Sequence, residues 1–112
     1  MSDCIFCKIA SGEIDSEAIY RDDEIIVIKD INPQAPVHLL VIPAKHYQDL
    51  TAPEFEAPLM GRLLAKASEL GKRYGQENGF RVVINTGRLA GQTVGHVHFH
   101  VLSGRELQWP PG

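Results

Sequence analysis

The sequence contains few cysteines, no long apolar run and no cluster of basic residues, and each shortage narrows the class of protein. No apolar run approaches the roughly 18 residues that cross a membrane. Residues 1–13, MSDCIFCKIASGE, lack both the basic stretch and the apolar stretch of a secretory signal. We therefore expect a cytoplasmic protein that does not insert into a membrane.

Cysteine occurs only at Cys4 and Cys7. In a reducing compartment this C-x-x-C spacing favours metal binding or redox chemistry over a structural disulfide. The fold does not need cross-links, because 112 residues suffice for a single domain, residues 1–112, with a substantial core. An apolar content of 44% is likewise typical of a globular protein.

Neither sign of charge dominates the chain. Its 14 acidic and 11 basic residues give a net charge of −3 and are interspersed. Because no basic run is present, binding to nucleic acid or to an anionic lipid surface is not expected. A small anionic ligand remains possible wherever a few local groups can receive it.

The pattern of apolar residues predicts an α+β domain. One long helix is predicted to begin at a capping box, Thr51 to Glu54, and to end at Gly75. Its apolar stripe, at helical spacing, is Phe55, Leu59, Leu63, Ala67, Leu70 and Tyr74. Five strands of antiparallel character surround it in the order β-β-β-α-β-β: residues 18–21, 24–30, 38–43, 80–85 and 96–102.

The last of these segments carries three of the five histidines. Side chains alternate along a strand, so His96, His98 and His100 are predicted to share one face. Val97, Phe99 and Val101 then share the other and anchor the strand to the helix. Histidines two residues apart lie roughly 6.6 Å apart along a strand. That spacing suits an elongated phosphate ester better than one small ion.

The loop before the histidines supports a phosphate site. Its glycines, Gly87, Gly91 and Gly95, allow the backbone to approach a ligand. Asn85, Gln92 and Thr93 offer neutral donors, and a neutral imidazole can attack phosphorus while a second handles protons. A catalytic zinc cluster is the alternative, but the motif has no acidic residue close in sequence to serve it.

The sequence as a whole resembles the histidine triad (HIT) family. HVHFHVL (96–102) matches the signature His-φ-His-φ-His-φ-φ, where φ is apolar, and CIFCKI, DINPQAPVHLLVIPAKH and GQTVGHVHFHVL extend the similarity. The terminal WPPG resembles the Hint branch, the histidine triad nucleotide-binding proteins. The resemblance implies a HIT-like fold, namely an antiparallel five-stranded sheet with one long helix and a short N-terminal helix. It also implies a homodimer.

The resemblance further implies a purine nucleoside phosphoramidase that works through a covalent nucleotidyl-histidine and needs no catalytic cofactor. His98 would be the nucleophile, with His100 on the phosphate and His38 in a proton relay beside the triad, whose first histidine is His96. On residues alone, His38 could equally hydrogen-bond to the backbone.

The same resemblance implies contacts to an AMP- or GMP-type nucleotide. Asp30 would bind the ribose, although an aspartate there could merely end a strand. Apolar residues that would otherwise be ordinary core would line the base pocket: Ile5, Phe6, Ile9, Ile28 and Ile31. The phosphate and leaving group would meet Asn85, Gly91, Gln92 and Thr93, and Trp109 would reach the partner subunit's site.

Some family members that contain C-x-x-C carry a zinc ion. Here the matching ligands are Cys4, Cys7, His46 and His96, a donor set suited to a tetrahedral structural zinc. The alternative is two free thiols and two ordinary histidines. If zinc is bound, His96 is held by the metal and clamps the start of the catalytic strand.

Two other functions remain open. One is a diadenosine polyphosphate hydrolase of the Fhit type, against which the WPPG tail argues. The other is a non-enzymatic nucleotide-binding or protein-interaction module, against which the intact triad argues. Gly95 departs from the bulkier residue that the family usually has before the triad, so the preferred leaving group stays open.

Overall fold

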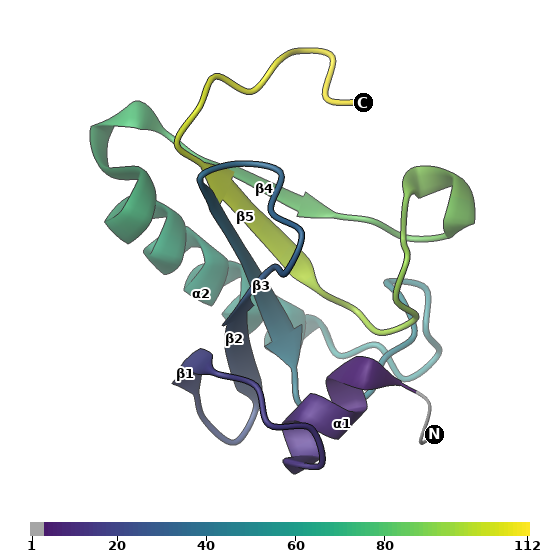
Figure 1. Ribbon diagram of the computed structural model, residues 1–112. Coiled ribbons are helices and arrows are strands. Elements are labelled where there is room, and N and C mark those ends of the chain that lie inside the picture. The colour runs from purple at the N-terminus through teal and green to yellow at the C-terminus, as the bar shows by residue number, and fades with distance from the viewer. Residues whose placement is uncertain (1–3) are drawn as a thin grey trace.

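The computed structural model describes residues 4–112 and is built around one antiparallel five-stranded sheet (Figure 1). The strand order is β1-β2-β3-β5-β4, so β1 and β4 form the two edges. The strands are β1 (Ala18–Arg21), β2 (Ile25–Lys29), β3 (Val37–Pro43), β4 (Arg81–Ile84) and β5 (Phe99–Ser103). The helices are α1 (Ile5–Ser11) and α2 (Ala57–Gly75), with short 3-10 turns η1 (Gln76–Asn78) and η2 (Arg88–Ala90). The predicted α+β class is confirmed, with its antiparallel five-stranded sheet, one long helix and short N-terminal helix.

The sheet has an apolar layer on each face because its central strands are apolar on both sides. Leu39 and Val41 of β3 pack with Phe99 and Val101 of β5 in the cluster that α2 completes. On the opposite face, Leu40 and other β2 and β3 residues pack against α1. The short helix α1 therefore lies on the face that His38 and His100 share, as strand alternation requires (Figure 1).

Helix α2 begins later than its sequence predicts. Its N-cap is Glu56, which makes no side-chain capping bond. The predicted capping box is wrong: Thr51 instead bonds to Asp49 Oδ1 through its backbone N at 2.8 Å and its hydroxyl at 2.6 Å. Proline in the first turn of α2 suits a helix start, because proline has no N–H to satisfy there. The end at Gly75 is as predicted.

The buried stripe of α2 is shorter than predicted at both ends. Leu59, Leu63, Ala67 and Leu70 are buried against the sheet. Phe55, which precedes the helix, and Tyr74 are 40% and 41% exposed. Among residues 4–112, no helix combines the length and the apolar character that crossing a bilayer requires.

Strand β5 begins at Phe99, so the predicted strand 96–102 starts too early. Its pairing with β3 extends from Val37 opposite Ser103 to Val41 opposite Phe99. Before Phe99 the backbone leaves this ladder, and Val97 N donates to Tyr47 O at 2.7 Å. His96 and His98 therefore lie outside the ladder, in the segment that leads into the strand, and His96 sits in a bend where its N donates to Val94 O at 2.8 Å.

Candidate active site and metal centre

His98 and His100 lie side by side on the face of the sheet that α1 covers. Their ring centroids are 4.9 Å apart, and the Phe6 ring of α1 meets the His98 ring edge-on at 5.2 Å. His38, from the neighbouring strand β3, approaches His100 with 2.9 Å between Nε2 and Nδ1. The structure thus brings together three of the four predicted catalytic histidines, and the fourth, His96, faces a different group of residues.

The backbone determines which ring nitrogen of His98 holds the hydrogen. His98 Nδ1 lies 2.8 Å from the backbone O of His96. A carbonyl oxygen only accepts hydrogen bonds, so Nδ1 carries the hydrogen and donates. The lone pair of this buried ring is therefore on Nε2. A neutral imidazole with a free Nε2 is the form that can attack phosphorus.

The hydrogens of His38 and His100 follow from a backbone donor in the same way. Gln34 N–H donates to His38 Nδ1 at 3.0 Å, so His38 carries its hydrogen on Nε2. That nitrogen faces His100 Nδ1 at 2.9 Å and Asp30 Oδ2 at 3.3 Å. With Nδ1 accepting, His100 carries its own hydrogen on Nε2. The His38–His100 pair therefore presents the His100 Nε2–H as a donor beside the Nε2 lone pair of His98.

Burial keeps these rings neutral near pH 7. Desolvation lowers the pKa of His38, and the Asp30 carboxylate opposes that shift. The pKa of His100 falls to about 4, first through desolvation and then through repulsion from His98 and His38, with Asp30 again opposing. Neutral rings act as hydrogen-bond donors and acceptors rather than as fixed charges.

The side chains predicted to contact the phosphate differ in whether they are free to bind a ligand. The Gln92 side chain is used within the protein: it accepts from Gly87 N at 2.9 Å and donates to Gln48 O at 2.8 Å. It therefore braces the loop rather than offering a free amide. Asn85 lies beside this loop, with its Nδ2 near Gly91, and Thr93 is exposed. Gly91 has a positive φ of 97°, so glycine is required by the turn.

The predicted base-pocket residues divide into two groups. Phe6, Ile9 and Ile28 are buried among other apolar side chains and belong to the core. Ile5 and Ile31 are 44% and 99% exposed. Trp109 is 80% exposed on the C-terminal tail. These three exposed side chains are the ones that a ligand or a second subunit could cover.

Asp30 does more than end a strand. Its Oδ1 accepts from Asn32 N at 2.8 Å and its Oδ2 faces His38, so the carboxylate joins the loop to His38. A cavity of about 490 Å³ lies beside it, lined also by Lys29, Pro36 and Tyr74. Sequence reasoning missed this cavity and missed Gln34, whose contribution is a backbone N–H. No residue type signals such a donor, since every residue except proline has one.

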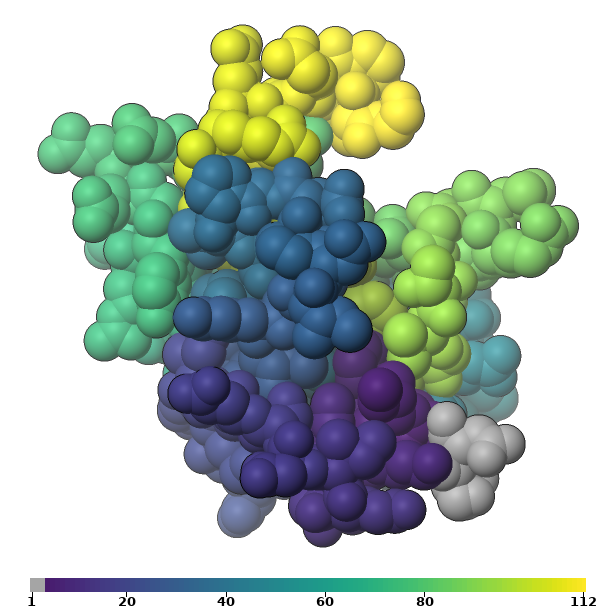
Figure 2. Space-filling model, viewed as in Figure 1, coloured from purple at the N-terminus to yellow at the C-terminus, as the bar shows by residue number. Residues whose placement is uncertain are grey.

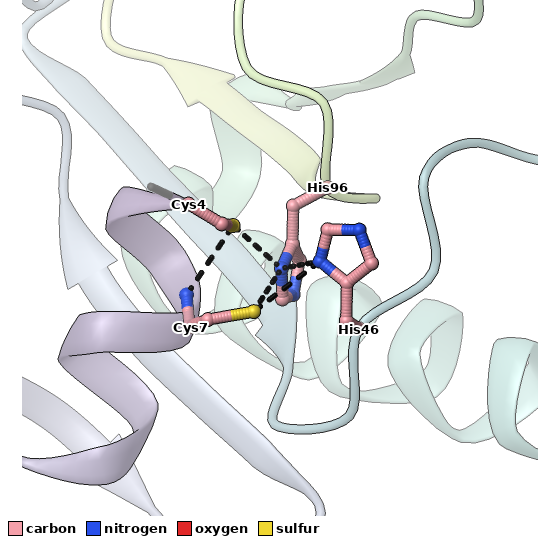
Figure 3. Close-up of side chains that lie close together, drawn as sticks. All are labelled: Cys4, Cys7, His46 and His96. Atoms are coloured by element: carbon pink, nitrogen blue, oxygen red, sulfur yellow. Dashed lines mark hydrogen bonds between the residues drawn. The ribbon is translucent and has the colours of Figure 1, made fainter. Parts of the chain in front are cut away.

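Cys4, Cys7, His46 and His96 converge from three parts of the chain (Figure 3). Four ligand atoms lie within 4.8 Å of one another. His96 Nδ1 is 3.2 Å from both Cys4 Sγ and His46 Nδ1, and Cys7 Sγ is 3.2 Å from His46 Nδ1. Tetrahedral zinc would place two nitrogens about 3.3 Å apart and a nitrogen and a sulfur about 3.6 Å apart.

The protonation of His96 also suits a metal. Its Nε2 lies 2.8 Å from Pro43 O and donates to it, so the lone pair on Nδ1 points at the cysteines. Burial lowers the pKa of His96 to about 4 and keeps the ring neutral. By contrast, Asp30, His38 and His100 also lie close enough for a metal, but His38 presents a hydrogen there and not a lone pair.

Comparison with known proteins shows the family to which the fold belongs. Residues 11–107 match the model of the HIT domain. The chain belongs to the HIT family. The crystal structure of a HIT family hydrolase from Legionella pneumophila superposes with a TM-score of 0.91 at 42% identity, covering 97% of this chain and 99% of that one. A histidine triad protein from Clostridium difficile gives 0.88 at 43% identity, with 96% of each chain covered.

Sequence relatives extend the HIT assignment. Protein HitA of Neisseria gonorrhoeae is 47% identical, covering 91% of this chain and 96% of its own. A 14 kDa zinc-binding protein of Brassica juncea is 46% identical over 98% of this chain and all of its own. Cys4 and Cys7 precede the segment that matches the HIT domain, so the candidate metal centre joins α1 to the family's core.

Proposed function

We propose that this HIT protein hydrolyses purine nucleoside 5′-phosphoramidates through a nucleotidyl group carried on His98. The observation that carries the proposal is the hydrogen bond from His98 Nδ1 to His96 O at 2.8 Å. It leaves the Nε2 lone pair free next to a neutral donor, His100. Similarity to solved HIT family hydrolases supports the reaction class.

The reaction has two steps. His98 Nε2 forms a bond to the α-phosphorus while the P–N bond breaks, and the departing nitrogen takes a proton and leaves as an amine. Water then attacks the same phosphorus, the N–P bond to His98 breaks, and a nucleoside monophosphate is released. In both steps negative charge on the non-bridging oxygens is stabilised by the His100 Nε2–H.

The neutral His38–His100 pair acts as a donor in this scheme. A neutral ring that gave up its remaining hydrogen would become an imidazolate, which is too basic to form near pH 7. The proton for the leaving nitrogen therefore comes from solvent in this scheme. The Asp30 carboxylate orients His38 and remains available to a ribose hydroxyl.

The same proposal includes nucleotide and metal binding. Ile5 and Ile31, exposed here, would cover one face of the purine, and Asn85 and Gly91 would contact the phosphate. Zinc would be held by the ligands Cys4, Cys7, His46 and His96. It would supply a cross-link that fixes α1, and with it Phe6, against the triad. No catalytic cofactor is part of the scheme.

A homodimer is also part of the proposal. Strand β4 is a sheet edge, and next to it Phe80 is 39% exposed. Trp109, at 80% exposure, is available to a partner subunit. Light scattering coupled to size-exclusion chromatography should give twice the 12.4 kDa chain mass; a mass of one chain at micromolar concentration would contradict the dimer.

The decisive experiment compares substrates and locates the adduct. We expect turnover of adenosine 5′-phosphoramidate to exceed that of a diadenosine polyphosphate. His98→Asn, whose amide can still donate to His96 O, should abolish turnover while AMP still binds. Mass spectrometry of rapidly quenched protein should find the nucleotidyl group on His98. Turnover by the variant, or an adduct elsewhere, would refute the mechanism. AMP binding without turnover by the wild type would favour a binding module.

A further inference from the structure

The loop between β2 and β3, residues 30–36, supplies the N–H that sets the protonation of the His38–His100 pair. That N–H belongs to Gln34 and donates to His38 Nδ1 at 3.0 Å. The loop is exposed along most of its length, and only Ala35 is buried. Pro33 and Pro36 border the cavity of about 490 Å³, so one side of the loop faces this cavity and is not packed against other residues. Packing alone therefore does not fix the position of Gln34.

The C-terminal tail contacts this loop from the other side. In the space-filling view the start of the tail lies directly against the loop (Figure 2). Gly104, which follows β5, has a φ of +99°, and a Cβ there would lie 2.8 Å from Pro36 Cβ. Only glycine permits both this backbone conformation and this approach. The tail and the loop are thus in direct contact where the sheet ends.

Arg105 donates a hydrogen bond to Gln34, the loop residue whose N–H binds His38. Its Nε donates to Gln34 O at 2.9 Å, and its Nη1 donates to Glu106 O at 3.0 Å. Gln34 is therefore held at both ends, its N–H by His38 and its C=O by Arg105. A guanidinium is charged at every relevant pH, and a charged donor makes a stronger hydrogen bond than a neutral one.

We propose that Arg105 is a positioning residue for the His38–His100 pair, an inference that rests on the proposed function. Through the Gln34 backbone, Arg105 keeps a donor on His38 Nδ1, and this keeps the hydrogen of His38 on Nε2. Without it, His38 is free to carry its hydrogen on Nδ1 instead. His100 Nδ1 then has no donor from His38, and the N–H that His100 presents to a phosphate is no longer enforced.

Ring nitrogen spectra test the proposal without requiring turnover. In long-range ¹H–¹⁵N correlation spectra at pH 7.5, wild-type His38 should show the form with hydrogen on Nε2. Arg105→Ala should shift His38, and with it His100, toward a mixture of the two forms. Arg105→Lys, which keeps one charged donor, should restore part of the wild-type pattern. His38 and His100 signals unchanged in Arg105→Ala would overturn the proposal.

Kinetics provide the second measurement. For a phosphoramidate substrate, Arg105→Ala should lower kcat about tenfold, within the ~100-fold that a 1 Å misplacement of a catalytic group can produce. KM should change less than about twofold, since Arg105 does not touch substrate. Arg73→Ala is the matched control, because it removes an exposed arginine of α2 for which no side-chain hydrogen bond is found among residues 4–112. An equal loss in Arg73→Ala, or a change in KM alone, would refute the positioning role.

The two measurements separate failure of this inference from failure of the proposed function. If wild-type protein does not hydrolyse phosphoramidates, the proposed function fails, but the His38 spectra still show whether Arg105 sets its protonation. Gln34→Pro removes the N–H that carries the effect and should reproduce the spectrum of Arg105→Ala. A Gln34→Pro protein with the wild-type His38 form would overturn the path through the backbone of residue 34.

Discussion

Acid should destabilise the protein through His100, and the size of the effect follows from its environment. Burial and the neighbouring histidines lower the pKa of His100 from an ordinary 6.5 to about 4. Between those values the unfolded chain binds a proton that the folded protein does not bind. The contribution of His100 to the free energy of unfolding is thus fully present above pH 6.5, and it is lost as the pH falls toward 4.

The magnitude can be worked from the same values. A difference of about 2.5 units at 1.36 kcal/mol per unit corresponds to about 3 kcal/mol. Because solvent reaches this partly exposed ring, about 2 kcal/mol is the better expectation. That is a large fraction of the ~5–15 kcal/mol by which a small domain is stable.

Urea unfolding of wild type and His100→Gln at pH 7 and at pH 4.5 measures the effect. The glutamine does not titrate, so the wild type should lose about 2 kcal/mol more than the variant over this interval. Contributions from His38, His96 and the carboxylates are common to both proteins and cancel in the comparison to first order. Parallel losses in the two proteins would show that His100 is not held neutral by its surroundings, and the donor role assigned to it would fall.

Three further predictions concern packing and the metal centre. Gly71→Ala places a Cβ 2.2 Å from the Phe80 ring, so it should lower the free energy of unfolding by about 1–3 kcal/mol, and Phe80→Ala in the same chain should reverse part of the loss. Elemental analysis should find one zinc per chain in wild type and none after Cys4→Ser with Cys7→Ser; chelation should lower the thermal midpoint of the wild type alone, and equal midpoints would exclude a stabilising metal. Gly95→Tyr should fold normally, because a Cβ there meets no atom within 4 Å, and a lowered midpoint would contradict that; its effect on turnover should differ between small and bulky amines.

Alternation of side chains allowed much of the site to be predicted. A period of two residues placed Val97, Phe99 and Val101 in the core, and the structure confirms them there. It also placed His98 and His100 together on the opposite face, although the strand begins only at Phe99. For His98 and His100 the prediction held because burial of Val97, Phe99 and Val101 on the α2 side directs these two rings to the other face of the sheet. His96, predicted on the same face, instead lies with Cys4, Cys7 and His46.

The start of α2 could not be predicted from a capping pattern alone. Thr51 has the right side chain for an N-cap, but Asp49 lies two residues before it and binds both its N–H and its hydroxyl. Two local hydrogen bonds thus compete directly with the helix for the same groups. The helix begins where Pro58 falls within the first turn and the apolar stripe reaches the sheet.

The protonation of three of the histidines, His38, His96 and His98, is determined by a backbone group that no sequence motif displays. Carbonyl oxygens of Pro43 and His96 accept from His96 Nε2 and His98 Nδ1, which leaves each of those rings a lone pair on its other nitrogen. At His38 the polarity is reversed, because an N–H is supplied instead of a carbonyl, and the ring is left with a donor. Under the proposed function, the same type of side chain would serve as a metal ligand, a nucleophile or a donor according to the backbone group beside it. On the same proposal, a change in the tail or in the 30–36 loop should alter catalysis while every histidine of the motif stays in place.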